Sequence, residues 1–199
     1  NHRITCPKGE LDLQSPRLAE STLPITFDYQ IPEQQLSLEL PRLVSTTSSA
    51  DGNRASEGLT LALQLALQQE GEVWRFSGAL QADAGQVYID PVFLDLDKMP
   101  IALKFSGKTN TQTARIQVDN FELTQPGVLT ARGALNWNAG LEAATVDIRQ
   151  AQLPAAFTTY AQPFLIGTTW GSLSTDGTLQ TKIKYDAKGW SRIQVAGGA

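Results

Sequence analysis

Histidine and cysteine, the residues most often used in catalytic pairs and zinc sites, are almost missing from this chain. Its 199 residues include one histidine, His2, and one cysteine, Cys6. A Ser-His-Asp or Cys-His catalytic pair would have to use His2 at the amino terminus, and a closed zinc site lacks its four ligands. An internal disulfide is excluded as well. We interpret Cys6 as an unpaired thiol near a mobile terminus, and we predict no metal site and no catalytic residue.

Several motifs and sequence runs that would assign the chain to a function class are also missing. The Gly-x-Ser-x-Gly, Walker and Gly-x-Gly-x-x-Gly motifs do not occur, so we expect no enzyme and no cofactor. No run approaches the about 18 consecutive apolar residues of a membrane-spanning helix. The 16 Lys and Arg residues are scattered against 20 Asp and Glu residues, with a net charge of −4. Nucleic acid is therefore not an expected partner.

The most informative feature that the chain does contain is a leucine at every second position, at Leu59, Leu61, Leu63, Leu65 and Leu67. On a helix, side chains at this spacing would spread around the circumference, whereas on a strand they all point to one face. The period therefore predicts a strand, although Leu, Ala and Gln favour helices. Burying these five side chains contributes on the order of 8–15 kcal/mol, so we expect something to cover them.

The same alternation recurs along the chain and predicts the fold class. Shorter alternating runs surround residues 58–68, and turn signals such as Asp51-Gly52, Asn138-Ala139-Gly140 and Asp176-Gly177 separate them. We predict a mainly β protein: an antiparallel meander that forms a curved, taco-like amphipathic sheet or an open barrel. A β-sandwich with a closed core is the alternative. Glycines recur in similar contexts near the expected strand starts, at Gly78, Gly107, Gly133 and Gly177, and predict a sheet that curves in the same way at each step.

Two segments break the strand rhythm within the single β-rich domain that we predict over residues 1–199. Pro154 can occupy the first turn of a helix and Pro163 should end or kink it, so we expect a short helix near 154–161. Residues 46–57 are rich in Ser and Thr around Asp51-Gly52 and predict a flexible loop. The chain starts without methionine, which indicates a processed product or a segment of a longer protein.

Three sets of polar or aromatic residues are candidate sites with simpler explanations. Asp90, Asp95 and Asp97 could bind calcium, but alternation with Leu94 and Leu96 favours a solvated strand face. Lys182 and Lys184 fit the wet side of a strand whose dry side carries Ile183 and Tyr185. The four tryptophans, Trp74, Trp137, Trp170 and Trp190, could stack on sugars, although aromatic residues on sheets usually belong to the core.

Two stretches of the chain resemble a known family. Residues 160–179, where Gly171-Ser172-Leu173 and Gly177-Thr178-Leu179 each open a strand after a short helix, resemble a recurring unit of the AsmA-like and TamB-like envelope proteins. Residues 76–96, with Gly85-Gln86-Val87-Tyr88-Ile89, are similar to them too. The resemblance implies a β-rich groove protein in the periplasm of a Gram-negative bacterium, anchored at the inner membrane in its full length, that handles phospholipid without catalysis.

The functional hypothesis combines this resemblance with the leucine run. We expect a non-enzymatic module that takes part in phospholipid transfer or outer-membrane lipid homeostasis, with acyl chains shielded by Leu59, Leu61, Leu63, Leu65 and Leu67. One alternative is an assembly scaffold of an envelope or secretion complex, with a closed core and exposed edge strands that bind envelope proteins. The other is a carbohydrate-binding sandwich that uses the tryptophans.

Overall fold

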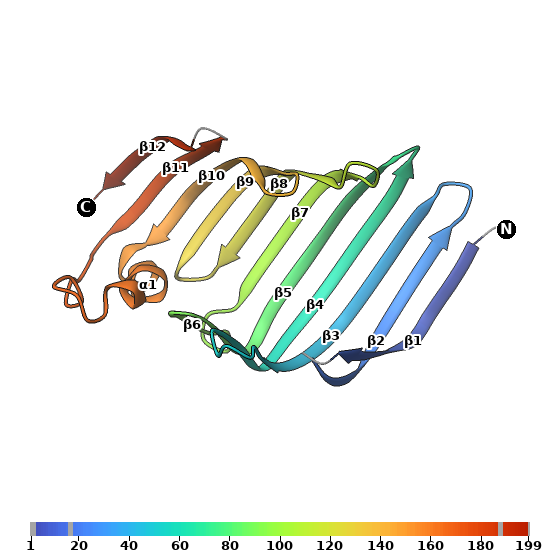
Figure 1. The fold of residues 1–199 in the computed structure, drawn as a ribbon, viewed down its shortest axis with the longest axis horizontal. Helices are drawn as coiled ribbons and strands as arrows, with labels where there is room; N and C mark the ends of the chain where they lie inside the picture. Colours follow the sequence, from blue (N-terminus) through green and yellow to red (C-terminus); the bar gives the residue numbers. More distant parts are fainter. Residues whose placement is uncertain (1–2, 16–17, 187–188, 199) are drawn as a thin grey trace.

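All strands in the described part of the chain belong to one antiparallel sheet (Figure 1). The structure is a computed structural model that describes residues 3–15, 18–186 and 189–198, with side chains for residues 3–10 and 23–186. The strands are β1 (Arg3–Ser15), β2 (Leu18–Gln30), β3 (Gln35–Ser48), β4 (Arg54–Glu70), β5 (Val73–Ile89), β6 (Val92–Asp95), β7 (Ile101–Asn110), β8 (Arg115–Gln125), β9 (Leu129–Trp137), β10 (Leu141–Gln152), β11 (Thr178–Asp186) and β12 (Gly189–Gly198).

The strands follow one another across the sheet in chain order. Eleven of them run from β1 at one edge to β12 at the other, and β6 is a short side branch that pairs with β5. Each strand is antiparallel to its neighbour, as in a meander of hairpins. The predicted open antiparallel meander is confirmed, and the sheet does not close on itself. A two-layered sandwich is wrong for the described residues, because every strand belongs to the same layer.

The leucine run lies in the middle of β4, as its period predicted. Leu61, Leu63, Leu65 and Leu67 are each opposite an apolar residue or a glycine on both flanking strands. Leu63, for example, lies between Leu40 of β3 and Leu80 of β5. Cross-strand packing of such pairs stabilises a sheet, and it outweighs the helix preference of the individual residues.

Three of the recurring glycines lie inside strands, not near strand starts as predicted. Gly78, Gly107 and Gly133 occupy the middle of β5, β7 and β9, whereas Gly177 directly precedes β11. A β-carbon at Gly78 would lie 2.6 Å from Cζ of Phe105, and one at Gly107 would lie 2.7 Å from Cζ of Phe76. The glycines thus accommodate an aromatic ring and, at Gly107 and Gly133, also the close approach of a backbone carbonyl oxygen of the neighbouring strand, that of Gln117 and of Thr145.

A helical segment follows β10. It begins with α1 (Leu153–Ala156), continues as one π-helical turn over Phe157–Ala161 and ends as a 3-10 turn over Gln162–Leu165. The predicted helix near 154–161 is confirmed and extends four residues further. Pro154 lies in its first turn. The helix type changes at Gln162, immediately before Pro163, in keeping with the expected interruption.

Two loops differ in extent from the prediction. The loop expected over residues 46–57 is confined to 49–53, because β3 reaches Ser48 and β4 begins at Arg54. Ser49 and Asp51 close this turn through hydrogen bonds to each other and to Arg54 and Asn53. The strand expected to hold both Asp95 and Asp97 ends at Asp95, and Asp97 lies in the following turn.

Few side chains of the described part are buried: Leu23 lies on β2, and a small core lies at one corner of the sheet, away from β2. Leu96 and Val128 are each 2% exposed, and Gln125, at the end of β8, is 1% exposed. The Tyr160 hydroxyl donates to Oε1 of Gln125 at 2.6 Å, and Nε2 of Gln125 donates to the Met99 carbonyl at 3.3 Å. This corner holds the helical segment against the sheet and leaves most of the apolar strand positions without a second layer.

Candidate functional site

The face of the sheet that carries the leucine run is apolar over most of its described strands. Residues directly opposite each other on neighbouring strands point to the same face, so register identifies the members of each row. The row through Leu65 crosses ten strands, and the row through Leu63 crosses seven strands before it ends at the polar Thr181 of β11. The Leu65 row consists of Cys6, Phe27, Leu38, Leu65, Gly78, Phe105, Phe121, Gly133, Val146 and Ile183. The Leu63 row consists of Leu40, Leu63, Leu80, Leu103, Leu123, Ala131 and Ile148.

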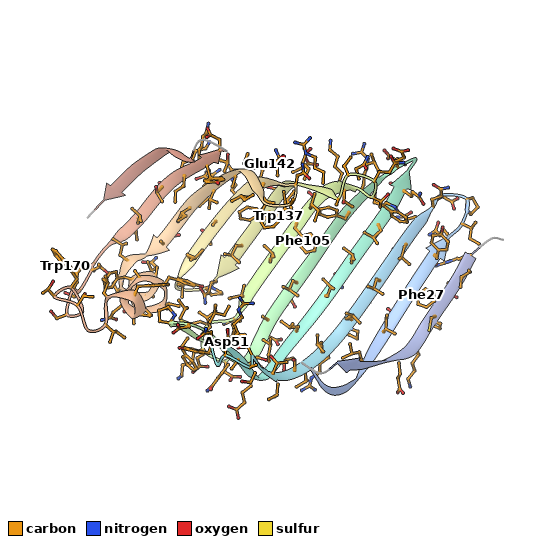
Figure 2. The ribbon with its side chains drawn as sticks, viewed as in Figure 1. Phe27, Asp51, Phe105, Trp137, Glu142 and Trp170 are labelled. Atoms are coloured by element: carbon orange, nitrogen blue, oxygen red, sulfur yellow. The ribbon has the colours of Figure 1, made fainter. Side chains whose placement is uncertain are left out.

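The five predicted leucines share this apolar face. Leu61, Leu63, Leu65 and Leu67 face neighbours in β3 and β5, and Leu59 lies opposite Ser45 at the margin of the apolar region. All five are half-buried, not buried. Figure 2 shows Phe27, Phe105 and Trp137, from β2, β7 and β9, spread over the same sheet. The apolar face is therefore far larger than the single strand that the sequence identified. Sequence reasoning missed residues such as Phe27 and Phe121 because no comparable alternating run surrounds them.

The opposite face of the sheet is polar and carries ion pairs between strands. Arg115 of β8 lies 2.6 Å from Glu142 of β10, and Arg132 of β9 lies 3.3 Å from Asp147 of β10. Hydrogen bonds from Arg115 and Asn138 hold the pKa of the Glu142 carboxyl below its usual value. Lys182 and Lys184 are exposed on β11, while Ile183 and Tyr185 pair with Val146 and Ala144 on the apolar side, as the sequence predicted.

A shallow hollow of 650 Å³ crosses β1 to β7 along the Leu65 row. Its lining includes Leu65 together with Gln64 and Ala66, and the same pattern of three consecutive residues recurs on the neighbouring strands. Sequence neighbours of Leu65 point to the other face, and neither Leu63 nor Leu67 lines the hollow, so it opens on the polar side. A ligand of the leucines would therefore lie along an extended surface.

The acidic candidates have partners within the protein. Asp95 forms an ion pair with Lys98 at 2.7 Å, and the hydrogen bond from Lys98 lowers the pKa of Asp95. Asp90 accepts a hydrogen bond from the Tyr88 hydroxyl at 2.7 Å. Among the residues that the structure describes, no group of three His, Cys, Asp or Glu side chains is placed to hold a metal ion. Asp90 is exposed in the turn before β6, whereas the Asp95 side chain on β6 is 17% exposed, so the solvated strand face that we expected is wrong for Asp95.

The three tryptophans with described side chains do not form one platform. Trp137 lies on β9 and is 46% exposed, whereas Trp170 lies in the loop after the helical segment and is 63% exposed. Figure 2 shows the two rings at separate positions along the sheet. Trp74 is half-buried on β5, and the side chain of Trp190 lies outside the described residues. Coplanar stacking on one sugar chain has no support in Trp74, Trp137 and Trp170.

The two remaining sequence candidates are at the amino terminus. Cys6 is a free thiol, as predicted, but it belongs to β1 and faces Phe27 of β2 on the apolar face. His2 lies outside the described residues. No pairing of Cys6 with a general base is seen in the part of the chain with described side chains.

Comparisons with known proteins leave the site to be judged on its own geometry. Searches against protein-family models, curated proteins and solved structures gave no significant match. Within the described residues, none of the helices has the length and apolar character needed to cross a lipid bilayer. The observation on which function must rest is therefore the apolar face itself.

Proposed function

We propose that this chain is a non-enzymatic periplasmic module, similar to the AsmA-like envelope proteins, that shields phospholipid acyl chains on the apolar face of its sheet. The proposal places it in phospholipid transfer or outer-membrane lipid homeostasis. The observation that carries it is the unbroken Leu65 row, which crosses ten strands without a polar residue. Residues 76–96 and the step Gly177-Thr178-Leu179, which opens β11, support the family through their resemblance. The expectation that Gly171-Ser172-Leu173 also opens a strand is wrong, because these residues lie in the turn and loop before β11.

The dimensions of the face suit several acyl chains. Ten spacings between eleven strands, at about 4.8 Å each, make the sheet about 48 Å wide. One acyl chain spans half of the hydrocarbon core of a bilayer, which is about 30 Å thick. Each methylene that leaves water for an apolar surface contributes roughly 0.8 kcal/mol. A continuous face would let a chain move along it without an intermediate step into water.

The test compares one substitution on each side of β4. Leu63→Asp introduces a charge into the apolar face, and Ala66→Asp introduces the same charge on the polar face, where it lies opposite Ser37 and Ser77. Protein purified from a Gram-negative host is examined by native mass spectrometry, followed by organic extraction of bound molecules. We expect co-purified phospholipid in the wild type and in Ala66→Asp, and its loss in a folded Leu63→Asp protein.

Two outcomes would contradict the proposal. A wild-type protein that carries no lipid and takes none up from vesicles does not bind acyl chains. Loss of folding in Leu63→Asp, while Ala66→Asp folds, would instead indicate that the face needs a covering layer for stability.

A scaffold that uses its edge strands is the second candidate, and β1 gives limited support. β1 and β12 lie at the ends of the strand order, so each has one unpaired side within the described sheet. However, β1 contains Pro7 and a register shift between Cys6 and Gly9. Both features weaken pairing along an edge. The acyl-chain proposal therefore takes precedence.

A further inference from the structure

A second apolar surface lies outside the sheet, at the end of the helical segment and in the loop that leads from it to β11. Four large apolar side chains are exposed there within ten positions: Phe164 is 61% exposed, Ile166 74%, Trp170 63% and Leu173 44%. Figure 2 shows Trp170 at the extreme end of the molecule, away from the strands. We call residues 164–173 the apolar loop. Side chains this large and this exposed on consecutive turns indicate an interaction surface.

The charge pattern around the apolar loop is also unusual for this chain. No charged residue occurs between Arg149 and Asp176, which is the longest uncharged stretch in the sequence. Apart from Leu165, the residues between the four large side chains are Gly, Thr and Ser, so their polar groups are small and neutral. A surface that contacts a charged or strongly polar partner would carry complementary charges, and the apolar loop carries none.

The apolar loop is built from successive hydrogen-bonded turns. The Thr168 amide donates to the Leu165 carbonyl at 3.0 Å, and the Leu173 amide donates to the Trp170 carbonyl at 3.0 Å. The Thr168 hydroxyl also donates to the Leu165 carbonyl at 2.7 Å and accepts from the Trp170 amide at 3.2 Å. Because these bonds satisfy backbone groups internally, the loop can enter an apolar medium at lower desolvation cost.

The base of the loop is fixed to the sheet. Thr159 is 7% exposed, and Tyr160 is held by its hydrogen bond to Gln125 at the buried corner. The helical segment therefore presents one side to the protein and continues into the exposed loop. This arrangement aims Phe164, Ile166 and Trp170 outward.

We propose that the apolar loop inserts into the interfacial region of a lipid bilayer and thereby docks the sheet at a membrane surface. Tryptophan and large aliphatic side chains without charge suit the boundary between headgroups and acyl chains. Because basic residues are missing from the loop, binding does not depend on anionic lipid. This function goes beyond the acyl-chain site, since it concerns an intact bilayer and uses different residues from those of the leucine face.

The experiment measures flotation of the protein with phosphatidylcholine vesicles. Ile166→Glu and Trp170→Glu place a charge on the apolar loop, and Ile89→Glu places the same charge at a comparably exposed apolar residue, 54% exposed at the end of β5. We expect each loop substitution to reduce the bound fraction by about tenfold or more, because a charge at the bilayer interface opposes insertion, and Ile89→Glu to bind as the wild type does.

A fluorescent label reports insertion directly. Cys6 is the single cysteine, so a Cys6→Ser background with Thr169→Cys carries one environment-sensitive dye on the loop. Gln112→Cys in the turn between β7 and β8 provides the control position. We expect a blue shift with vesicles for the dye at position 169 and none at position 112.

The outcomes separate this proposal from the acyl-chain site. Leu63→Asp should still float, and the loop variants should still hold extractable lipid, if both proposals are correct. Wild-type protein that does not float, or loop variants that float normally, would overturn the docking proposal alone. Self-association that Ile166→Glu abolishes, without vesicle binding, would overturn it in favour of a protein contact.

Discussion

Phe105 and Gly78 lie directly opposite each other on β7 and β5, with the ring of Phe105 occupying the place of the side chain that Gly78 lacks. A β-carbon at Gly78 would lie 2.6 Å from Cζ of Phe105. One row further along, the roles are exchanged, because Phe76 of β5 lies over Gly107 of β7. The two rings are 6.1 Å apart, centroid to centroid, and tilted by 54°. The two strands thus interlock through a reciprocal pair of aromatic residues and glycines.

The interlocked pair predicts a penalty for any side chain at Gly78. We expect Gly78→Val to lower the free energy of unfolding by about 1–3 kcal/mol, because a β-carbon there meets both the Phe105 ring and, at 2.7 Å, the backbone carbonyl oxygen of Gln64. Urea denaturation measures the change. Gly140→Val is the control, since nothing lies within 4 Å of a β-carbon built at Gly140. Phe105→Ala should relieve part of the penalty in the double variant, and strictly additive effects would contradict the relationship.

The buried corner predicts a large cost for truncating Leu96. This side chain is 2% exposed, so Leu96→Ala should leave a cavity and cost about 2–5 kcal/mol. Leu173→Ala, at a leucine that is 44% exposed, should change stability by less than about 0.5 kcal/mol. Chemical denaturation of both variants is the measurement. Equal effects would show that the corner is not the core that the burial indicates.

Tyr160 predicts a specific loss when its hydroxyl is removed. Tyr160→Phe leaves Oε1 of the buried Gln125 without its hydrogen-bond donor, so we expect a loss of about 1–3 kcal/mol. Tyr88→Phe is the comparison, because it removes a hydroxyl that donates to Asp90 in a solvent-exposed hydrogen bond. Water can replace that donor, so the loss of stability should be smaller. Thermal unfolding of the two variants tests the difference. A greater loss in Tyr88→Phe would contradict the assignment.

Tyr160 also predicts a pH dependence. Burial raises the pKa of its phenol. Because the folded-state pKa of Tyr160 is raised, the contribution of the neutral phenol to the free energy of unfolding is complete below the pKa of unfolded tyrosine. This contribution is lost as the pH rises through the folded-state pKa. We therefore expect stability to fall in the alkaline range more steeply in the wild type than in Tyr160→Phe. Parallel curves for the two proteins would refute this.

Local patterns predicted the elements well where the period was long. The run from Leu59 to Leu67 specified a strand and one apolar face, because alternation is a property of neighbouring residues. The helix near Pro154 followed from proline chemistry. By contrast, the loop around Asp51 was predicted too long, since Thr46 and Thr47 favour strands as well as loops and pairing with β4 decided between them.

The candidate site was harder to predict than the fold. The leucines identified one strand of the apolar face, but Phe27, Phe121 and Val146 join Leu65 through register, which no local pattern reveals. The only sequence signal for the apolar loop was the long stretch without charged residues. Such a stretch fits a buried segment as well as an exposed apolar surface. The exposure of Ile166 and Trp170 distinguishes a surface from a core.

Composition and alternation were sufficient to establish a mainly β chain with one apolar and one polar side. Those properties depend on residue type and on spacing along the chain. The order of the strands and their register determined that ten apolar positions form one row from Cys6 to Ile183, because hydrogen bonding between strands acts over long sequence distances. The tertiary structure also leaves most of that face without a second layer. The helical segment covers one corner of the sheet, and all described strands pair edge to edge in the one sheet, so none of them packs over the face.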